Sequence, residues 1–194
     1  MNTLARTDLM SLEAYAEARQ DFRAAVIAHK KDRQVRIGPN ATLYFEDRLT
    51  VQYQIQEMLR IERIFESAAI EEELSAYNPL IPDGNNLKAT FMLEYAEVEE
   101  RRVALAHLTG VEDTVWAQVG GHERVFAIAD EDMERSREEK TSAVHFVRFE
   151  FSRAMTAAAK SGAAIAMGID HKACNLENNP LAEATRVALT ADFS

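Results

Sequence analysis

The stretch that decides the fold class is Leu87-Lys88-Ala89-Thr90-Phe91-Met92-Leu93-Glu94-Tyr95. Leu87, Ala89, Phe91 and Leu93 fall on one face of an extended chain, and most residues between them are polar. Because successive side chains of a strand point to opposite faces of a sheet, this alternation predicts a strand with one buried face and one wet face.

Further strands are predicted on both sides of this stretch, at residues 34–37, 42–45, 114–119, 123–128, 142–151 and 163–170. Gly38-Pro39-Asn40 is a turn signal between the first two, and Gly120-Gly121 predicts a two-residue hairpin. The segment 77–84 contains two prolines and an Asp-Gly pair, which predict a loop.

Helices are predicted at residues 11–30, 47–65, 67–76, 97–108, 130–140 and 153–160, with a last helix that begins near Pro180. Ser11 is the expected cap of the first helix, and 47–65 is expected to be the longest. Since hairpins interleave with helices, the sequence predicts an α+β fold, a mainly antiparallel sheet covered by helices. Its 194 residues fit one domain over 1–194.

The composition argues against several classes of protein. The net charge of −10 disfavours nucleic-acid binding, because an acidic surface repels phosphate. No stretch has the roughly 20 apolar residues of a membrane span, and the N-terminus is not a signal peptide, so we expect a cytoplasmic protein. A single cysteine, Cys174, excludes an internal disulfide framework. A homodimer is expected from the general frequency of dimers among soluble oligomers.

The familiar catalytic and cofactor motifs are missing from the sequence. It has no Gly-rich phosphate loop, no Gly-x-Ser-x-Gly elbow, no His-Glu-x-x-His and no Cys-x-x-Cys. It also has no Glu-x-x-His pair of the kind that binds di-iron centres on helices. No cofactor or metal is therefore assigned from a motif.

Two predicted strands carry the best polar constellation. His145 lies on the strand 142–151, and Asp170 and His171 end the strand 163–170. If these strands pair antiparallel, the three side chains come together, either for proton transfer or to hold a metal. The alternative is a hydrogen-bonded core histidine and an ordinary turn.

The row Ala164, Ala166 and Gly168 on the strand 163–170 lacks bulk. We expect a helix or a ligand to approach this row closely, because an uncovered row of small residues would leave a void.

The helix 47–65 presents a polar side that could bind an anion. Gln52, Gln56, Arg60 and Arg63 fall along it, and arginine binds carboxylates in a bidentate manner. A solvated helix face has the same composition. Arg48 and Arg148 are further candidates for ligand binding.

Glu62 is expected within the apolar stripe of the same helix, after Met58 and Leu59. A buried carboxylate must be neutral, paired or bound to something, so Glu62 is a candidate site residue. Its candidate partners are Arg48, Arg148, His145 or a metal.

Four segments look familiar together: 45–48 running into 54–60, then 77–84, 144–150 and 168–171. They resemble a bacterial family catalogued as domain of unknown function 3501, over nearly the whole chain. The resemblance carries no activity or catalytic residue. It implies a setting near rubrerythrin-like and iron–sulfur proteins, and hence redox or stress physiology with such proteins as partners.

The function expected from the sequence is therefore an accessory or ligand-binding protein of cytosolic redox or stress metabolism. The alternative is an enzyme whose acid–base or metal-assisted chemistry uses Glu62, His145, Asp170 and His171.

Overall fold

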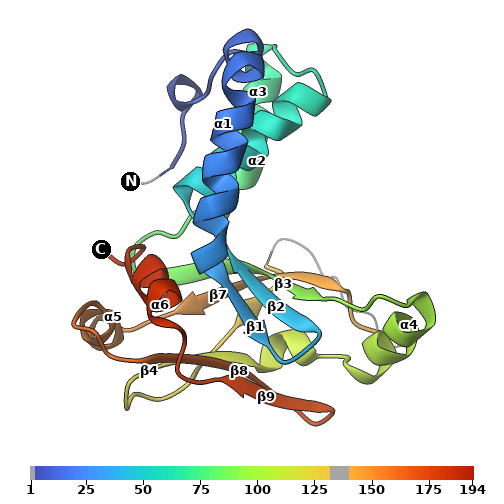
Figure 1. Ribbon diagram of the computed structural model, residues 1–194, viewed down its shortest axis with the longest axis vertical. Coiled ribbons are helices and arrows are strands. Elements are labelled where there is room, and N and C mark those ends of the chain that lie inside the picture. Colours follow the sequence, from blue (N-terminus) through green and yellow to red (C-terminus); the bar gives the residue numbers. More distant parts are fainter. Residues whose placement is uncertain (1–2, 132–139) are drawn as a thin grey trace.

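Figure 1 shows the computed structural model, which describes residues 3–131 and 140–194. Two antiparallel sheets form the body, and a group of helices rises from it as an arm. The fold is α+β with antiparallel sheets, as the sequence predicts. Among the described residues, no helix combines the length and apolar character needed to cross a membrane.

The first sheet has the order β1-β2-β3-β7-β6, and the second has the order β5-β4-β8-β9. The first consists of β1 (Gln34–Ile37), β2 (Ala41–Phe45), β3 (Asn86–Leu93), β7 (Val144–Glu150) and β6 (Ile128–Ala129). The second consists of β5 (Val125–Phe126), β4 (Val115–Val119), β8 (Ile165–His171) and β9 (Cys174–Asn178).

The main core lies between the two sheets. The first sheet contributes the alternating face of β3, where Phe91 is fully buried, and the second contributes residues such as Met167 of β8. The edges of the sheets also meet, since the Asn178 side chain of β9 donates to the carbonyl of Arg36 in β1. Helices α4 (Val98–His107), α5 (Arg153–Lys160) and α6 (Glu183–Thr190) flank this body.

The arm consists of α1 (Leu12–Lys30), α2 (Arg48–Ile61) and α3 (Ser67–Tyr77), with the short 3-10 turn η3 (Asn78–Leu80) after it. It has a small core of its own, which includes Val51, Ile55 and Leu74. Ser11 caps α1, as predicted, by accepting from the N–H of Ala14.

A buried arginine joins the arm to the body. Arg33, just after α1, is 2% exposed and donates to the carbonyls of Phe45, Glu46 and Ala188. Its guanidinium also pairs with the carboxylate of Asp192, which follows α6. We call these contacts the Arg33 clamp.

Several boundaries differ from the prediction. The longest helix among the described residues is α1, and α2 ends at Ile61 because Arg63 takes a left-handed φ of 55°. The strand β9 was not predicted, and α6 begins at Glu183 instead of near Pro180. Most of the predicted helix 130–140 lies outside the described residues.

At Gly168 the small-residue row of β8 is covered by a side chain of a neighbouring strand, where a helix or a ligand was expected. A Cβ on Gly168 would lie 2.4 Å from the Trp116 ring of β4, which fills that space. The guanidinium of Arg124 stacks 3.9 Å above the same ring. Ala164, at the start of the row, is exposed.

Candidate functional site

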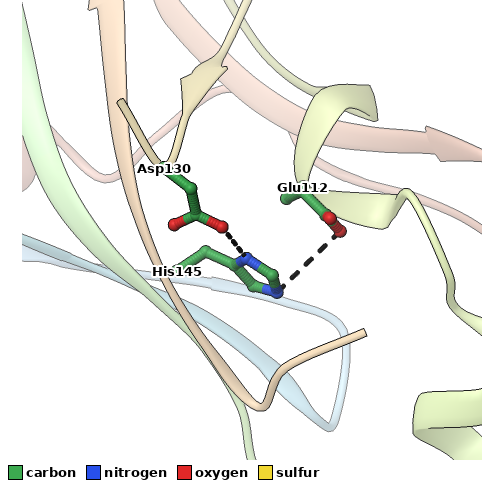
Figure 2. Close-up of side chains that lie close together, drawn as sticks. All are labelled: Glu112, Asp130 and His145. Atoms are coloured by element: carbon green, nitrogen blue, oxygen red, sulfur yellow. Dashed lines mark hydrogen bonds and ion pairs between the residues drawn. The ribbon is translucent and has the colours of Figure 1, made fainter. Parts of the chain in front are cut away.

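A cluster of polar side chains lies at the end of β7, at the edge of the main core. Glu112 comes from the 3-10 turn η4 (Val111–Thr114), Asp130 follows β6, and Thr141 and His145 come from the segment that enters β7. Figure 2 shows the imidazole of His145 between the two carboxylates. We call these four residues the His145 centre.

The His145 ring is fixed on both sides. Its Nδ1 lies 2.6 Å from Oδ2 of Asp130, and its Nε2 lies 2.9 Å from the hydroxyl of Thr141. Nε2 is also 3.1 Å from the carbonyl of Ser142 and 3.8 Å from Oε2 of Glu112. The side chain of His145 is fully buried, and those of Glu112 and Asp130 are 8% exposed. A buried imidazole with oxygens at both nitrogens can hold a proton or a metal ion.

The backbone holds Asp130 in place. Its N–H donates to the carbonyl of Phe146, and its Oδ1 accepts from the N–H of the same residue. Asp130 has a φ of 52°, a left-handed conformation that aspartate tolerates better than most residues. These contacts aim Oδ2 at the imidazole.

Thr141 connects the other carboxylate to the ring, since its hydroxyl donates to Oε2 of Glu112 at 2.9 Å. Its backbone N–H is bonded to the carbonyl of Leu105 in α4. Asp113, the residue that follows Glu112, is exposed. Partial desolvation of its carboxyl group, together with the charges of Glu112 and Asp130, raises its pKa.

A hollow lies where the arm crosses the outer face of the first sheet. Its volume is about 590 Å³, within the range of small-molecule sites. The arm contributes Ala76, Tyr77, Pro79 and Leu80, and the sheet side contributes Glu46, Lys88, Ala89, Ile128, Glu131, Phe146, Val147 and Arg148. We call this hollow the arm groove.

The predicted grouping of His145 with Asp170 and His171 is wrong, because β7 and β8 belong to different sheets. His171 is buried, and its ring contacts the carbonyl of Thr109 and the N–H of Ala173. Asp170 is exposed and lies 3.7 Å from Arg124. Only His145 belongs to the cluster.

The polar side of α2 holds the N-terminal segment of the chain. Gln56 is fully buried and exchanges hydrogen bonds with the backbone of Met10, while Gln52 donates to the carbonyl of Asp8. Arg48 pairs with the carboxylate of Asp8 at 2.8 Å.

The remaining arginines of the predicted anion site are exposed or paired locally. Arg60 lies 3.3 Å from Glu57, one turn earlier on α2, and Arg63 is exposed. Arg148 is the one candidate of this set that lines the arm groove.

Glu62 is exposed, so its predicted place in the apolar stripe was wrong. The helix ends at Ile61, and Glu62 is its C-cap. The helical period therefore does not extend to Phe65, which is 70% exposed.

Sequence reasoning missed Glu112, Asp130 and Thr141. Glu112 stands between Val111 and Val115 in a short turn with no periodic pattern, and Asp130 begins a strongly charged segment. Asp130 reaches His145 because β6 pairs with β7, and Glu112 reaches it because η4 lies beside β6; a single sequence encodes neither arrangement as a motif.

The fold and the cluster define a two-sheet antiparallel α+β protein with a helical arm and a buried histidine–carboxylate centre. The chain belongs to the family described as "Protein of unknown function (DUF3501)", which matches residues 3–193. The resemblance found in the sequence is thereby confirmed.

A solved structure from Burkholderia pseudomallei K96243, described as a novel protein of unknown function, is similar over the whole chain. It is 49% identical, with a TM-score of 0.93, and the match covers 99% of this chain and 100% of that one. No curated protein matches.

Proposed function

We propose that the protein is an accessory protein that binds a small amphipathic carboxylic acid in the arm groove. The setting proposed for it is cytosolic redox or stress metabolism, as expected from the family. The single observation that supports the ligand class is the way Arg148 already holds a carboxylate in the groove.

Arg148 grips Glu131 with a two-pronged contact. Its Nε and Nη2 donate to the two carboxylate oxygens, each at 2.8 Å, and this contact lowers the pKa of Glu131. Glu131 is 52% exposed, so a ligand carboxylate can take its place from solvent. The exchange of one carboxylate for another leaves the charge of the groove unchanged and keeps the charge-assisted bonds.

The rest of the groove suits an apolar tail. Ile128 is 40% exposed, and Leu80 and Phe146 line the same hollow. Lys88 lies opposite Arg148 across β3 and β7, and its ammonium donates to the carbonyls of Pro79 and Ile81 at 2.9 Å. Lys88 thus holds η3 over the sheet and keeps the groove formed.

Catalysis by the His145 centre is not part of this proposal. The His145 side chain has no exposed surface, and none of the described residues lining the arm groove belongs to the centre. A general acid or base must reach the proton that it transfers, directly or through one water.

Octanoate is a suitable probe, with octan-1-ol as the uncharged control of equal tail length. We expect saturable octanoate binding by calorimetry, with octan-1-ol at least roughly tenfold weaker because it cannot use the arginine fork. Arg148→Gln should weaken octanoate binding, and Glu131→Gln should strengthen it by removing the competing carboxylate.

Ala76→Trp fills the groove, and Ala68→Trp on the same helix is the matched control, since both alanines are exposed. The proposal predicts that only Ala76→Trp blocks octanoate. Equal binding by both tryptophan variants, or by Arg148→Gln and the unchanged chain, contradicts it.

A further inference from the structure

The His145 centre brings together three donor atoms from two parts of the chain, η4 and the segment that enters β7. They are Nε2 of His145, Oε2 of Glu112 and the hydroxyl oxygen of Thr141. The two oxygens are 2.9 Å apart, and they lie 2.9 Å (Thr141) and 3.8 Å (Glu112) from Nε2. Such a triangle has a point about 1.9 Å from all three atoms, so an ion slightly off its plane reaches the usual 2.0–2.2 Å metal–ligand distances.

Asp130 lies on the side of the imidazole ring away from Glu112 and Thr141, beside Nδ1. In metal sites a ligating histidine usually donates its other ring N–H to a carboxylate or carbonyl, which fixes the tautomer and the ring. Asp130 accepts at Nδ1 at 2.6 Å and is itself bonded to the backbone of Phe146. That arrangement leaves Nε2 as the coordinating nitrogen, on the side where Glu112 and Thr141 lie.

We propose that the His145 centre binds one divalent first-row transition-metal ion through His145, Glu112 and Thr141, with Asp130 as the positioning residue. The carbonyl of Ser142, 3.1 Å from Nε2, is the nearest further oxygen on that side.

The donor set indicates the kind of ion. One imidazole nitrogen with carboxylate and hydroxyl oxygens suits Zn²⁺, Mn²⁺ or Fe²⁺, whereas Cu(I) prefers sulfur ligands and Ca²⁺ and Mg²⁺ prefer oxygen alone. Cys174 lies elsewhere, in the apolar hollow next to Ile37 and Leu176. Because the centre is buried, a bound ion would have no open access from the surface. The centre is therefore a separate site from the arm groove, which lies on the outer face of β7.

The test uses the full chain, treated with a chelator, loaded separately with Zn²⁺ and Mn²⁺ and freed of excess metal by gel filtration. We expect about one Zn²⁺ or Mn²⁺ per chain by elemental analysis, with a higher melting temperature in the loaded protein. His145→Gln should retain no metal. His122→Gln is the matched control, because His122 lies on the Gly120-Gly121 hairpin and outside the centre, and it should retain the metal fully.

Two gentler variants keep the test decisive if His145→Gln does not fold. Thr141→Val preserves the shape of the side chain and removes one ligand, and Asp130→Asn removes the negative charge beside Nδ1 of His145. Each should weaken metal binding, by roughly 10- to 100-fold for Asp130→Asn. A folded, chelator-treated chain that retains neither ion overturns the proposal, as does folded Thr141→Val and Asp130→Asn protein with unchanged affinity. In that case His145 is a hydrogen-bonded core histidine.

Discussion

The Arg33 clamp and the His145 centre are both buried ionic clusters, and they are built in opposite ways. At Arg33, one cation lies in the middle, and its N–H groups donate to three carbonyls and one carboxylate in or just after β2 and α6. At His145, the oxygens of Glu112 and Thr141 converge with a ring nitrogen on a common point. The arginine is the centre of the first arrangement, whereas the second brings donor atoms of three side chains around one point.

Asp192 and Asp47 both lie beside Arg33, with Oδ2 of Asp47 3.5 Å from Nη1, and the pKa values of the two carboxyl groups shift in opposite directions. Burial raises the pKa of Asp192, although Arg33 opposes the shift. Burial has the same effect on Asp47, but there the Arg33 charge and the Thr50 N–H outweigh it and the pKa is lowered. The clamp therefore depends on its arginine, which is what we expect of a structural joint between the arm and the body.

The largest effect is expected when the clamp loses its cation. Arg33→Met leaves Asp192 buried without its arginine and takes one of two cations from Asp47, which keeps His29, so it should lower the free energy of unfolding by about 3–5 kcal/mol. Urea denaturation measures the loss. Arg36→Met on the exposed side of β1 is the control, with a change expected within about 0.5 kcal/mol. Equal losses of unfolding free energy in both variants would show that Arg33 does not stabilise the connection between the arm and the body.

Removal of the Thr141 hydroxyl distinguishes the two kinds of cluster. Thr141→Val deprives buried Glu112 of one donor and should cost about 1–3 kcal/mol in the metal-free chain. With Zn²⁺ present the loss should be larger, because bound ion stabilises the unchanged chain more than the variant. If the loss is the same with and without Zn²⁺, the centre is a static cluster like the clamp.

An ion cluster within the arm gives a pH-dependent comparison. Arg19, helped by Tyr15 and Arg60, lowers the pKa of Glu57 to about 2. A carboxylate with a lowered pKa stabilises the fold above its ordinary value near 4.5, and this contribution is lost as the pH falls toward 2.

Glu57→Gln should therefore cost about 1–2 kcal/mol at pH 7 and much less at pH 3, as measured by urea unfolding at both values. A loss that is equal at pH 7 and pH 3 would assign the effect to packing instead of charge.

The smallest effect is expected at Asp170, which the sequence placed beside His145. Its carboxylate is exposed and lies 3.1 Å from the amide of Asn175. Asp170→Asn should change the free energy of unfolding by less than about 0.5 kcal/mol and leave Zn²⁺ retention unchanged. Loss of Zn²⁺ in this variant would show that Asp170 contributes to the His145 centre.

Local patterns predicted most of the elements, because those elements follow a period. The alternation in 87–95 corresponds to β3, and Ser11 caps α1. The wrong predictions lie where the residues depart from a helical or strand period. Arg63 adopts a left-handed conformation and ends α2, and β9 has little apolar alternation.

The site was only partly predictable for a different reason. His145 drew attention as an ionisable residue on an apolar strand, which is a local signal. Glu112 and Asp130 are 33 and 15 residues away from it in sequence, and only the packing of η4 and β6 against β7 brings them within reach. Long-range pairing of this kind has no periodic signature.

The most direct test of the metal site is anomalous diffraction from a crystal grown from the full chain after it has been loaded with Zn²⁺, recorded at the zinc absorption edge. The account predicts one strong peak within about 2.0–2.2 Å of Nε2 of His145 and Oε2 of Glu112, with Asp130 still bonded to Nδ1. Zinc bound elsewhere, with no anomalous peak beside His145, would contradict it.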